Sequence, residues 1–269
     1  MCHTALIFSK TRKWLSPKFL REYFEFSRIA SLQRFTNGQT TILGKRILFS
    51  DSHSFLQAYQ EIFTQKLYHF KSGSKAPYIL DCGSNIGLSI LYFKRLYPQA
   101  KIIGFEPDPK LFQMLTSNLE QFGFNDVELH QKAILDSSKP VSFYTQGGSS
   151  GQVVMDQESI SDRPVIQVDS IQLNPFIASK VDFLKIDIEG AECSVLKSLK
   201  DHLHYVERMF VEYHSFADSK QDLDELLSVL KEANFRYHIY PAILKDLPFA
   251  DVEELEGMDM QLNIYAFKR

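Results

Sequence analysis

Short apolar runs alternate with longer amphipathic stretches through most of the chain. The runs have the length and composition of buried parallel strands, and the stretches that end near Leu96 and Gly123 carry apolar residues at helical spacing. This alternation predicts right-handed βαβ units and a doubly wound sheet, which is an α/β fold. The five runs predicted as parallel strands are residues 78–80, 101–105, 127–133, 181–186 and 209–211.

The last third of the chain departs from this pattern. Residues 235–240 and 262–267 form two apolar runs without a glycine-rich turn between them, so we expect an antiparallel end of the sheet. Between Asp136 and Asp169 lies an insertion with two predicted strands, residues 139–145 and 165–168. The Gly/Ser-rich loop at 147–151, within this insertion, is a candidate cover for a bound cofactor.

Helical and hairpin patterns precede the first sheet strand. The glycine- and serine-containing loop at 71–75 separates them from the rest. We therefore predict an N-terminal extension over residues 1–75 and a ligand-binding domain over residues 76–269. The expected elements of the extension are a helix at 18–32, a hairpin of residues 41–43 and 46–49 about Gly44-Lys45, and a helix at 55–70.

The charge balance excludes one large class of function. The 269 residues include 30 Lys and Arg against 33 Asp and Glu, for a net charge of -3. A nucleic-acid-binding protein usually carries a strongly cationic field, so we expect no nucleic-acid partner. The first thirty residues are locally basic, with six cationic residues against two acidic ones. This basic stretch could contact a membrane surface peripherally.

The sequence contains no pattern for export. Charges interrupt the N-terminal stretch too often for a signal peptide or a spanning helix. Cys2, Cys82 and Cys193 are isolated and lack CxxC spacing, which argues against a disulfide framework or a structural zinc site. A soluble protein of the cytoplasm is the expectation, and the sequence does not define its oligomeric state.

Two motifs mark a nucleoside site. The segment from Asp81 to Gly87, DCGSNIG, follows the first predicted strand and opens a helix, and its small residues let a ligand approach the backbone. Glu106 ends the second strand, where its carboxylate can accept hydrogen bonds from both ribose hydroxyls. Ligands of open α/β sheets bind outside the carboxyl ends of the strands, so we expect the two motifs to converge.

The glycine spacing bears on which nucleoside binds. Dinucleotide sites usually carry three glycines as GxGxxG, whereas only Gly83 and Gly87 are present here. NAD is disfavoured on this ground. An NAD-dependent oxidoreductase and a non-catalytic nucleoside-binding protein remain the alternatives to the activity described next.

Three motifs in order resemble the FkbM family of S-adenosylmethionine-dependent methyltransferases: DCGSNIG at 81–87, FEPDP at 105–109 and KIDIEGAE at 185–192. The resemblance extends over roughly residues 47–241. It implies a class I, Rossmann-like methyltransferase sheet of seven strands. It also implies methyl transfer to a hydroxyl of a carbohydrate, another glycan or a small secondary metabolite.

The same resemblance assigns the cofactor contacts. The turn from Gly83 to Gly87 lies against the methionine part, with Asp81 anchoring it, and Glu106 holds the ribose. Pro107 and Asp108 border the adenine on one side, and two residues after the third strand border it on the other. The implied S-adenosylmethionine-binding residues are Asp81, Gly83, Ser84, Asn85, Gly87, Glu106, Pro107, Asp108, Ala133, Ile134 and Asp187.

A second polar group follows the next two strands. Asp187 ends the fourth strand, and Glu212 and His214 follow the fifth on one side by period two. An alcohol acceptor must lose its proton, and a neutral histidine that ionises near pH ~6.5 can take it. His214 is our first candidate base, Asp187 the second, and Glu212 completes the group.

Other roles for these residues stay open. Asp187, Glu212 and His214 could instead bind a divalent cation, although we assign no metal ligand from the sequence. Glu189 and Glu192 are three residues apart and could share one face of the next helix in a purely structural role. The buried Lys185 needs an acidic partner, which nearby acids can supply.

Overall fold

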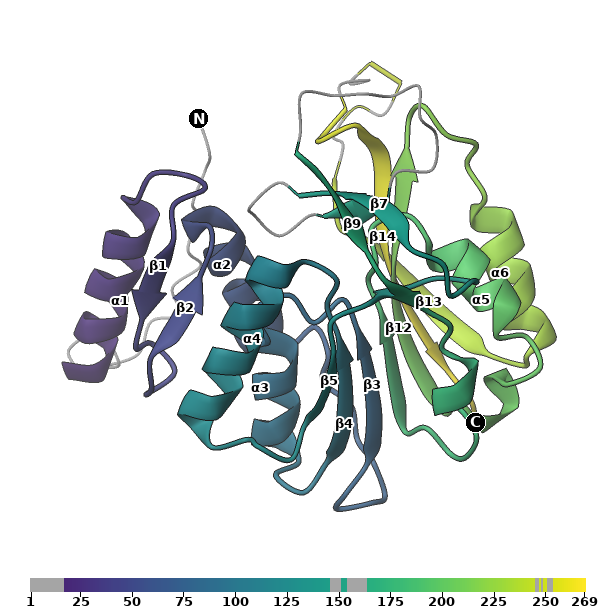
Figure 1. The fold of residues 1–269 in the computed structure, drawn as a ribbon, viewed down its shortest axis with the longest axis horizontal. Helices are drawn as coiled ribbons and strands as arrows, with labels where there is room; N and C mark the ends of the chain where they lie inside the picture. The colour runs from purple at the N-terminus through teal and green to yellow at the C-terminus, as the bar shows by residue number, and fades with distance from the viewer. Residues whose placement is uncertain (1–16, 146–150, 154–163, 245–246, 248, 251–253) are drawn as a thin grey trace.

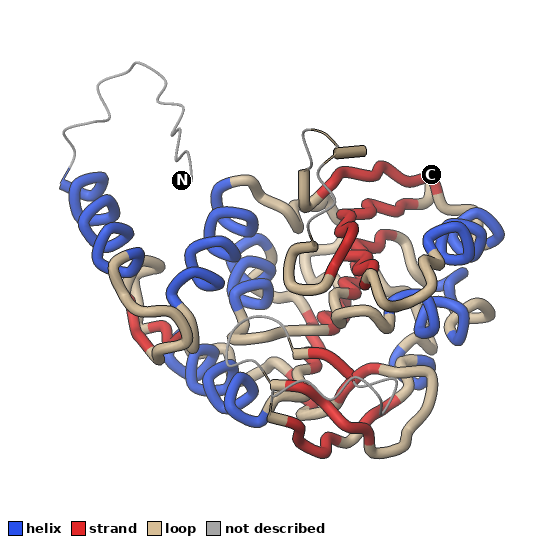
Figure 2. The backbone as a smooth tube through the Cα atoms, turned by 90° about the horizontal axis from the view of Figure 1, so that it is seen from above, coloured by secondary structure: helices blue, strands red, loops and turns tan. Residues whose placement is uncertain are grey.

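The molecule is built on a seven-stranded mixed sheet with helices on both faces (Figures 1 and 2). The computed structural model describes residues 17–145, 151–153, 164–244, 247, 249–250 and 254–269. In spatial order the strands are β13 (Arg236–Pro241), β14 (Met258–Phe267), β12 (Arg208–Phe216), β11 (Phe183–Ile186), β3 (Tyr78–Cys82), β4 (Lys101–Phe105) and β5 (Glu128–His130).

Period-two alternation along the central strands explains the burial of both faces. Ile79 and Phe183 face a core formed with α3 (Leu88–Leu96) and α4 (Pro109–Phe122). Their neighbours Leu80 and Leu184 face the opposite core. The helices α5 (Glu192–Ser198) and α6 (Leu223–Glu232) cover that side (Figure 1). The expected doubly wound α/β sheet of the class I methyltransferase type is confirmed.

The strand order places a crevice at the middle of the sheet. The chain runs outward through β3, β4 and β5, then returns to add β11 and β12 in parallel on the other side of β3. The two directions diverge at β3 and β11, and ligands of such sheets bind at this point. Strand β14 runs antiparallel to both β12 and β13, so the predicted antiparallel end is confirmed.

Several strand boundaries differ from the sequence prediction, and two of the differences bear on the site. The third strand ends at His130, because Ala133–Ile134 (β6) leaves the sheet and pairs in parallel with Ser170–Ile171 (β10). The fifth extends to Phe216, because β14 pairs with it along its length. Glu212 and His214 therefore lie within a strand and not after it.

The insertion between β6 and β11 forms a small sheet of its own. Strand β7 (Val141–Tyr144) lies between β8 (Gln152–Val153) and β9 (Val165–Val168), all antiparallel. The two strands predicted in the insertion are thus present, and most of the predicted glycine-rich loop lies outside the described residues. Short 3₁₀ turns occur at Asn174–Phe176 and Leu203–Tyr205.

The extension begins with α1 (Pro17–Ala30) and a hairpin of β1 (Gly38–Thr40) and β2 (Ile47–Phe49). The first hairpin strand thus lies before residues 41–43, where we expected it. The second helix, α2 (Ser52–Tyr59), continues as a π-helical turn over Gln60–Thr64 and stops there, well before residue 70. Lys66 has a φ of 62°, a left-handed conformation that cannot continue the helix.

The extension packs into the same core as one face of the sheet. Ile47, Phe49 and Phe55 are buried in a single cluster that also contains residues of α3, α4 and the central strands. Asn118 of α4 joins the parts directly: its amide accepts from Leu48 N at 2.7 Å and donates to Leu48 O and Ile86 O. The hairpin is therefore fixed against the helix that follows β4.

The basic N-terminal region is only partly described. Arg28 pairs with Glu25 at 2.8 Å, and the cationic residues before position 17 lie outside the described residues. Peripheral membrane contact stays a prediction. No helix in the described part of the chain is long and apolar enough to cross a membrane.

Candidate active site

A cavity opens at the carboxyl ends of β3, β4, β11 and β12, where the sequence motifs meet. The turn after β3 lines it with Gly83, Ser84 and Asn85, and the next strand contributes Glu106 and Pro107. Ala133 and Ile134 line the apolar part beside Phe105 and Phe143, as expected for a slot that holds a flat ring. Asp187, Glu212 and His214 line the same cavity. The structure therefore brings most of the predicted site residues together.

Three predicted contact residues do not line the cavity. Asp81 is fully buried and accepts a hydrogen bond from Ser89 Oγ at 2.7 Å. Asp108 caps α4 by accepting from the backbone N–H of Lys110 and Leu111. Gly87 begins α3 with a φ of 91°, and a Cβ there would lie 2.7 Å from Leu115 Cδ1. In the structure these three residues stabilise the strand end and the helix starts that surround the cavity.

Gly83 is needed for a reason that the sequence did not reveal. Its φ is 84°, and a Cβ at this position would lie 1.8 Å from the backbone oxygen of Asp187. The turn after β3 thus rests directly against the loop after β11. We expected the absence of a side chain to serve ligand approach, and the structure shows that it first serves contact between the two loops.

Glu106 is held in place by backbone donors. Its Oε2 accepts from Asn85 N at 2.8 Å and its Oε1 from Asp108 N at 2.9 Å. Burial raises the pKa of Glu106 to about 7, although the two backbone hydrogen bonds act in the opposite direction. Each carboxylate oxygen keeps a further lone pair. The carboxylate is therefore positioned, at the cavity wall, to accept hydrogen bonds from a ligand.

Lys185 has the acidic partners that its burial requires. Its ammonium lies 3.1 Å from Asp187 Oδ2 and 3.6 Å from Asp81 Oδ1, and it donates to the carbonyl of Gly83 at 2.8 Å. Burial alone would lower the pKa of Lys185, but the two carboxylates outweigh it and raise the pKa above its usual value. Lys185 thus ties the β3 turn to the start of the next loop.

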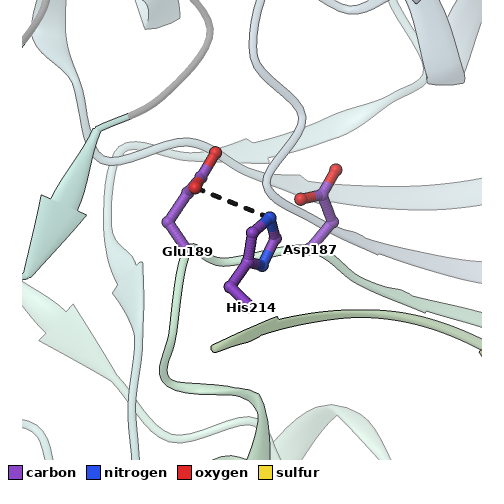
Figure 3. Close-up of side chains that lie close together, drawn as sticks. All are labelled: Asp187, Glu189 and His214. Carbon is purple, nitrogen blue, oxygen red and sulfur yellow. Dashed lines mark ion pairs between the residues drawn. The ribbon is translucent and has the colours of Figure 1, made fainter. Parts of the chain in front are cut away.

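His214 lies between two carboxylates of the β11–α5 segment. Its Nδ1 is 3.0 Å from Glu192 Oε1, and its Nε2 is 3.6 Å from Glu189 Oε2 (Figure 3). Glu189 precedes α5 and has a φ of 57°, so Glu189 and Glu192 do not share a helical face as we had expected. They face opposite nitrogens of the same imidazole.

The environment of His214 changes the expected ionisation. Burial would lower the pKa of His214, but the nearby carboxylates, Glu189 first, raise it well above 6.5. The expectation of ionisation near 6.5 was therefore wrong. Its physical cause is a surplus of negative charge that the sequence spacing alone could not place around the ring. Whether His214 acts as the base stays a prediction.

Glu212 has similar surroundings on the neighbouring position of β12. Enclosure in the cavity raises the pKa of Glu212 to about 8, and the negative charge of Asp187 adds to the effect. Gln261 of β14 donates its amide to Glu212 and lies 3.3 Å from His214 Nε2. The predicted pair of Glu212 and His214 therefore does face one side.

The ligand atoms that converge most closely differ from the set left open above. Asp187, Glu189 and His214 each offer one atom, and these atoms lie within 4.8 Å of one another. Glu189 takes the place we had considered for Glu212. Its position beyond the strand end gave no reason to select it, because the left-handed backbone at Glu189 turns the side chain back toward β12.

The extension supplies one wall of the cavity. Glu61 and Tyr68 line the cavity from the segment after α2. Burial, followed by the negative charge of Asp187, raises the pKa of Tyr68 well above 10. Neither residue stands in a recognisable motif. Their contribution depends on the extension folding back over the sheet.

Comparison with known proteins identifies the class. The fold and the site define a methyltransferase with a Rossmann-like sheet, and residues 81–237 match the methyltransferase FkbM domain. This match covers more than half of the chain, which therefore belongs to the FkbM methyltransferase family. The resemblance seen in the sequence is confirmed.

Individual relatives agree with this assignment. The chain is 30% identical over 200 residues to Methyltransferase 1 of Beauveria bassiana, covering 66% of this chain and 79% of the relative. It is 29% identical over 155 residues to the hexuronic acid methyltransferase AglP of Haloferax volcanii, covering 56% and 61%. A crystal structure of methyltransferase FkbM from Methylobacillus flagellatus superposes with a TM-score of 0.50 at 14% identity. That alignment covers 93% of this chain, which spans 60% of the solved chain.

Proposed function

We propose that the protein transfers a methyl group from S-adenosylmethionine to a hydroxyl of a carbohydrate or secondary metabolite. The observation that carries this proposal is the fixed Glu106 carboxylate, which shares one cavity with the Asp187, Glu212 and His214 group. One end of the cavity suits a nucleoside and the other suits proton transfer. The name of the Haloferax relative, a hexuronic acid methyltransferase, supports a sugar acceptor.

The residues at the cavity fit this donor. Glu106 can accept from two ribose hydroxyls, and Ala133 and Ile134 offer apolar contact to adenine. The carboxylates near Asp187 complement a positive charge. S-adenosylmethionine supplies a methyl group on a positively charged sulfur. The acceptor hydroxyl must lose its proton as its oxygen bonds to that carbon and the carbon–sulfur bond breaks. His214, our first candidate base, and the ionised form of Glu212 line the cavity where they can receive this proton. We further propose that the protein works in the cytoplasm.

Calorimetry with the purified full chain tests the donor. S-adenosylhomocysteine should bind, NAD should not, and Glu106→Ala should weaken binding by about 1 to 3 kcal/mol, the usual contribution of hydrogen bonds to a charged group. Binding of NAD in place of S-adenosylhomocysteine would favour the oxidoreductase alternative.

Turnover tests the chemistry separately. A screen of sugars and small hydroxylated metabolites with methyl-labelled donor should identify an acceptor. For that acceptor, His214→Ala should lower kcat by about 10²- to 10⁴-fold while leaving the donor affinity nearly unchanged. Donor binding without any methylated acceptor would instead favour the non-catalytic alternative.

A further inference from the structure

One end of the cavity contains a set of potential metal ligands, of which only Asp187 is also a predicted cofactor contact. The carboxylates of Asp187 and Glu189 lie on either side of the His214 imidazole (Figure 3), with one ligand atom from each residue within 4.8 Å of the others. Lys185 engages Asp187 through Oδ2 at 3.1 Å, which leaves the second oxygen of that carboxylate for another partner. Two carboxylates from the loop after β11 and one imidazole from β12 therefore converge.

The imidazole is oriented by a carboxylate behind it. The side chain of Glu192 is 1% exposed, and it accepts hydrogen bonds from the backbone N–H of Ile188 and Gly190 as well as from His214 Nδ1. These backbone bonds prevent Glu192 from turning away. Histidines that bind metals usually donate their other ring N–H to such a carboxylate. The Nε2 atom of His214 is the one that faces the cavity.

An independent residue points to a ligand at the same place. Tyr68 is 4% exposed and lines the cavity, and its hydroxyl has no hydrogen-bond partner among the described residues. Lys185 Nζ, which lies 3.1 Å from Asp187 Oδ2, is 5.7 Å from the centre of the Tyr68 ring, so Tyr68 lies beside the group. The hydroxyl is not among the fully enclosed unpartnered polar atoms of the described residues, so it opens onto the cavity and is available to donate to a ligand there. Tyr68 comes from the extension and belongs to neither of the two segments that supply the potential metal ligands.

We propose that Asp187, Glu189 and His214 bind one divalent cation, with Mn²⁺ the best match to two carboxylates and one imidazole. Carboxylate ligands suit Mg²⁺ and Mn²⁺, whereas imidazole favours transition metals. Given the proposed function, the cation orients the acceptor hydroxyl and lowers its pKa. The ionised form of Glu212 lines the same cavity and can take the released proton, and the Tyr68 hydroxyl can donate to the acceptor.

Titration of Mn²⁺ into the chelator-treated full chain, without donor, tests the site. Calorimetry should detect one cation per chain in the wild type and none in Glu189→Gln. Glu192→Gln, which changes only the support of the imidazole, should weaken binding by about 10- to 100-fold. The matched control is Glu128→Gln, an exposed carboxylate 2.7 Å from His130, which should bind Mn²⁺ as the wild type does.

The outcomes separate this proposal from the donor assignment. Far-UV circular dichroism establishes that each variant is folded, and His214→Gln provides the same comparison if Glu189→Gln is not. No saturable Mn²⁺ binding in the wild type, or unchanged binding in the folded ligand variants, would overturn the cation site. Mn²⁺ binding without S-adenosylhomocysteine binding would instead leave the cation site standing and reject the proposed donor.

Discussion

The Glu106 carboxylate is fixed by hydrogen bonds in a buried environment that disfavours its negative charge. Two backbone N–H groups fix its carboxylate, while burial raises its pKa to about 7. A protonated carboxyl accepts hydrogen bonds from ribose more weakly than a carboxylate does. Because the folded pKa lies near neutrality, a modest change in pH alters the form that binds the donor.

We therefore predict that the affinity for S-adenosylhomocysteine rises with pH through about 7. Ligand hydroxyls stabilise the ionised carboxylate, so binding is weaker below this pKa, where the carboxyl carries a proton, and stronger above it. Calorimetric titrations between about pH 6 and about pH 8 measure the slope. Glu106→Gln has the same shape without the ionisation and should lose the part of the slope due to Glu106. An identical slope in this variant would contradict the assignment.

Gly83 and Gly44 allow the cost of a left-handed backbone to be separated from the cost of a steric clash. Both have positive φ, but a Cβ at Gly44 meets nothing within 4 Å, whereas one at Gly83 meets the Asp187 carbonyl. Gly44→Ala should cost about 1 to 2 kcal/mol of unfolding free energy from the left-handed backbone alone. Gly83→Ala should cost clearly more, because a backbone loop must also move. Urea denaturation measures both, and equal losses would refute the proposed contact.

Residue type and strand position were enough to find most polar groups of the site. Glu106, Asp187, Glu212 and His214 stand out because they occur at strand ends or alternate along a strand in an otherwise apolar run. Glu192 did not stand out as the partner of His214, because a bond across 22 residues depends on how the loop turns. The same applies to Gln261, whose strand is paired only in the folded sheet.

At the scale of elements, buried strands were the most predictable part of the fold. β4 has the bounds expected from its apolar run, whereas β12 is longer than its apolar run because β14 pairs with it along its length. The helix after Asp51 ends early, before Lys66 with its left-handed backbone. A lysine in the sequence does not predict this conformation. Local patterns thus fail where a distant strand or an unusual φ decides the boundary.

The side chain of Asn118 in α4 joins this helix to the hairpin strand β2, and its replacement should destabilise both elements. Asn118→Asp keeps the shape but removes the two donors that satisfy Leu48 O and Ile86 O. Unpaired buried carbonyls cost about 1 to 3 kcal/mol each, and a buried charge adds to the cost. We predict a loss of at least about 2 kcal/mol in the free energy of unfolding. Asn37→Asp, at an exposed position, is the control.

Chemical denaturation followed by circular dichroism measures that difference. A loss in Asn118→Asp no larger than in the Asn37 control would mean that the amide does not join the hairpin to α4. The Asn118 side chain is fully buried, so it can affect the cavity only through the fold. Weaker binding of S-adenosylhomocysteine in Asn118→Asp, without a loss in the free energy of unfolding, would therefore also contradict the link.

For the whole molecule, the shared core predicts one cooperative unit. Phe49 of the hairpin is fully buried and stacks on Phe55 at 4.9 Å, in the same cluster as α3 and the central strands. Phe49→Ala should lower the free energy of unfolding by about 3 to 5 kcal/mol. Phe24→Ala removes the same side chain from a position that is 66% exposed and should cost less than about 0.5 kcal/mol.

Local hydrogen-exchange protection distinguishes a shared core from two separate ones. Hydrogen exchange should assign equal destabilisation to amides of β2 and of β3 in Phe49→Ala, since both belong to one packed unit. Weaker protection confined to residues before 71 would show instead that the extension unfolds by itself.

The wall contributed by Glu61 and Tyr68 has a consequence for how such an enzyme can change. These residues reach the cavity only because the segment before the sheet is packed into the core, so a library that varies this segment alters acceptor preference and thermal tolerance together. Glu61 is itself partly exposed, although the next residue, Ile62, is buried, so conservative changes at Glu61 alone offer the safest starting point for directed evolution. Wholesale exchange of the segment with that of a relative would have to carry its buried aromatic partners along.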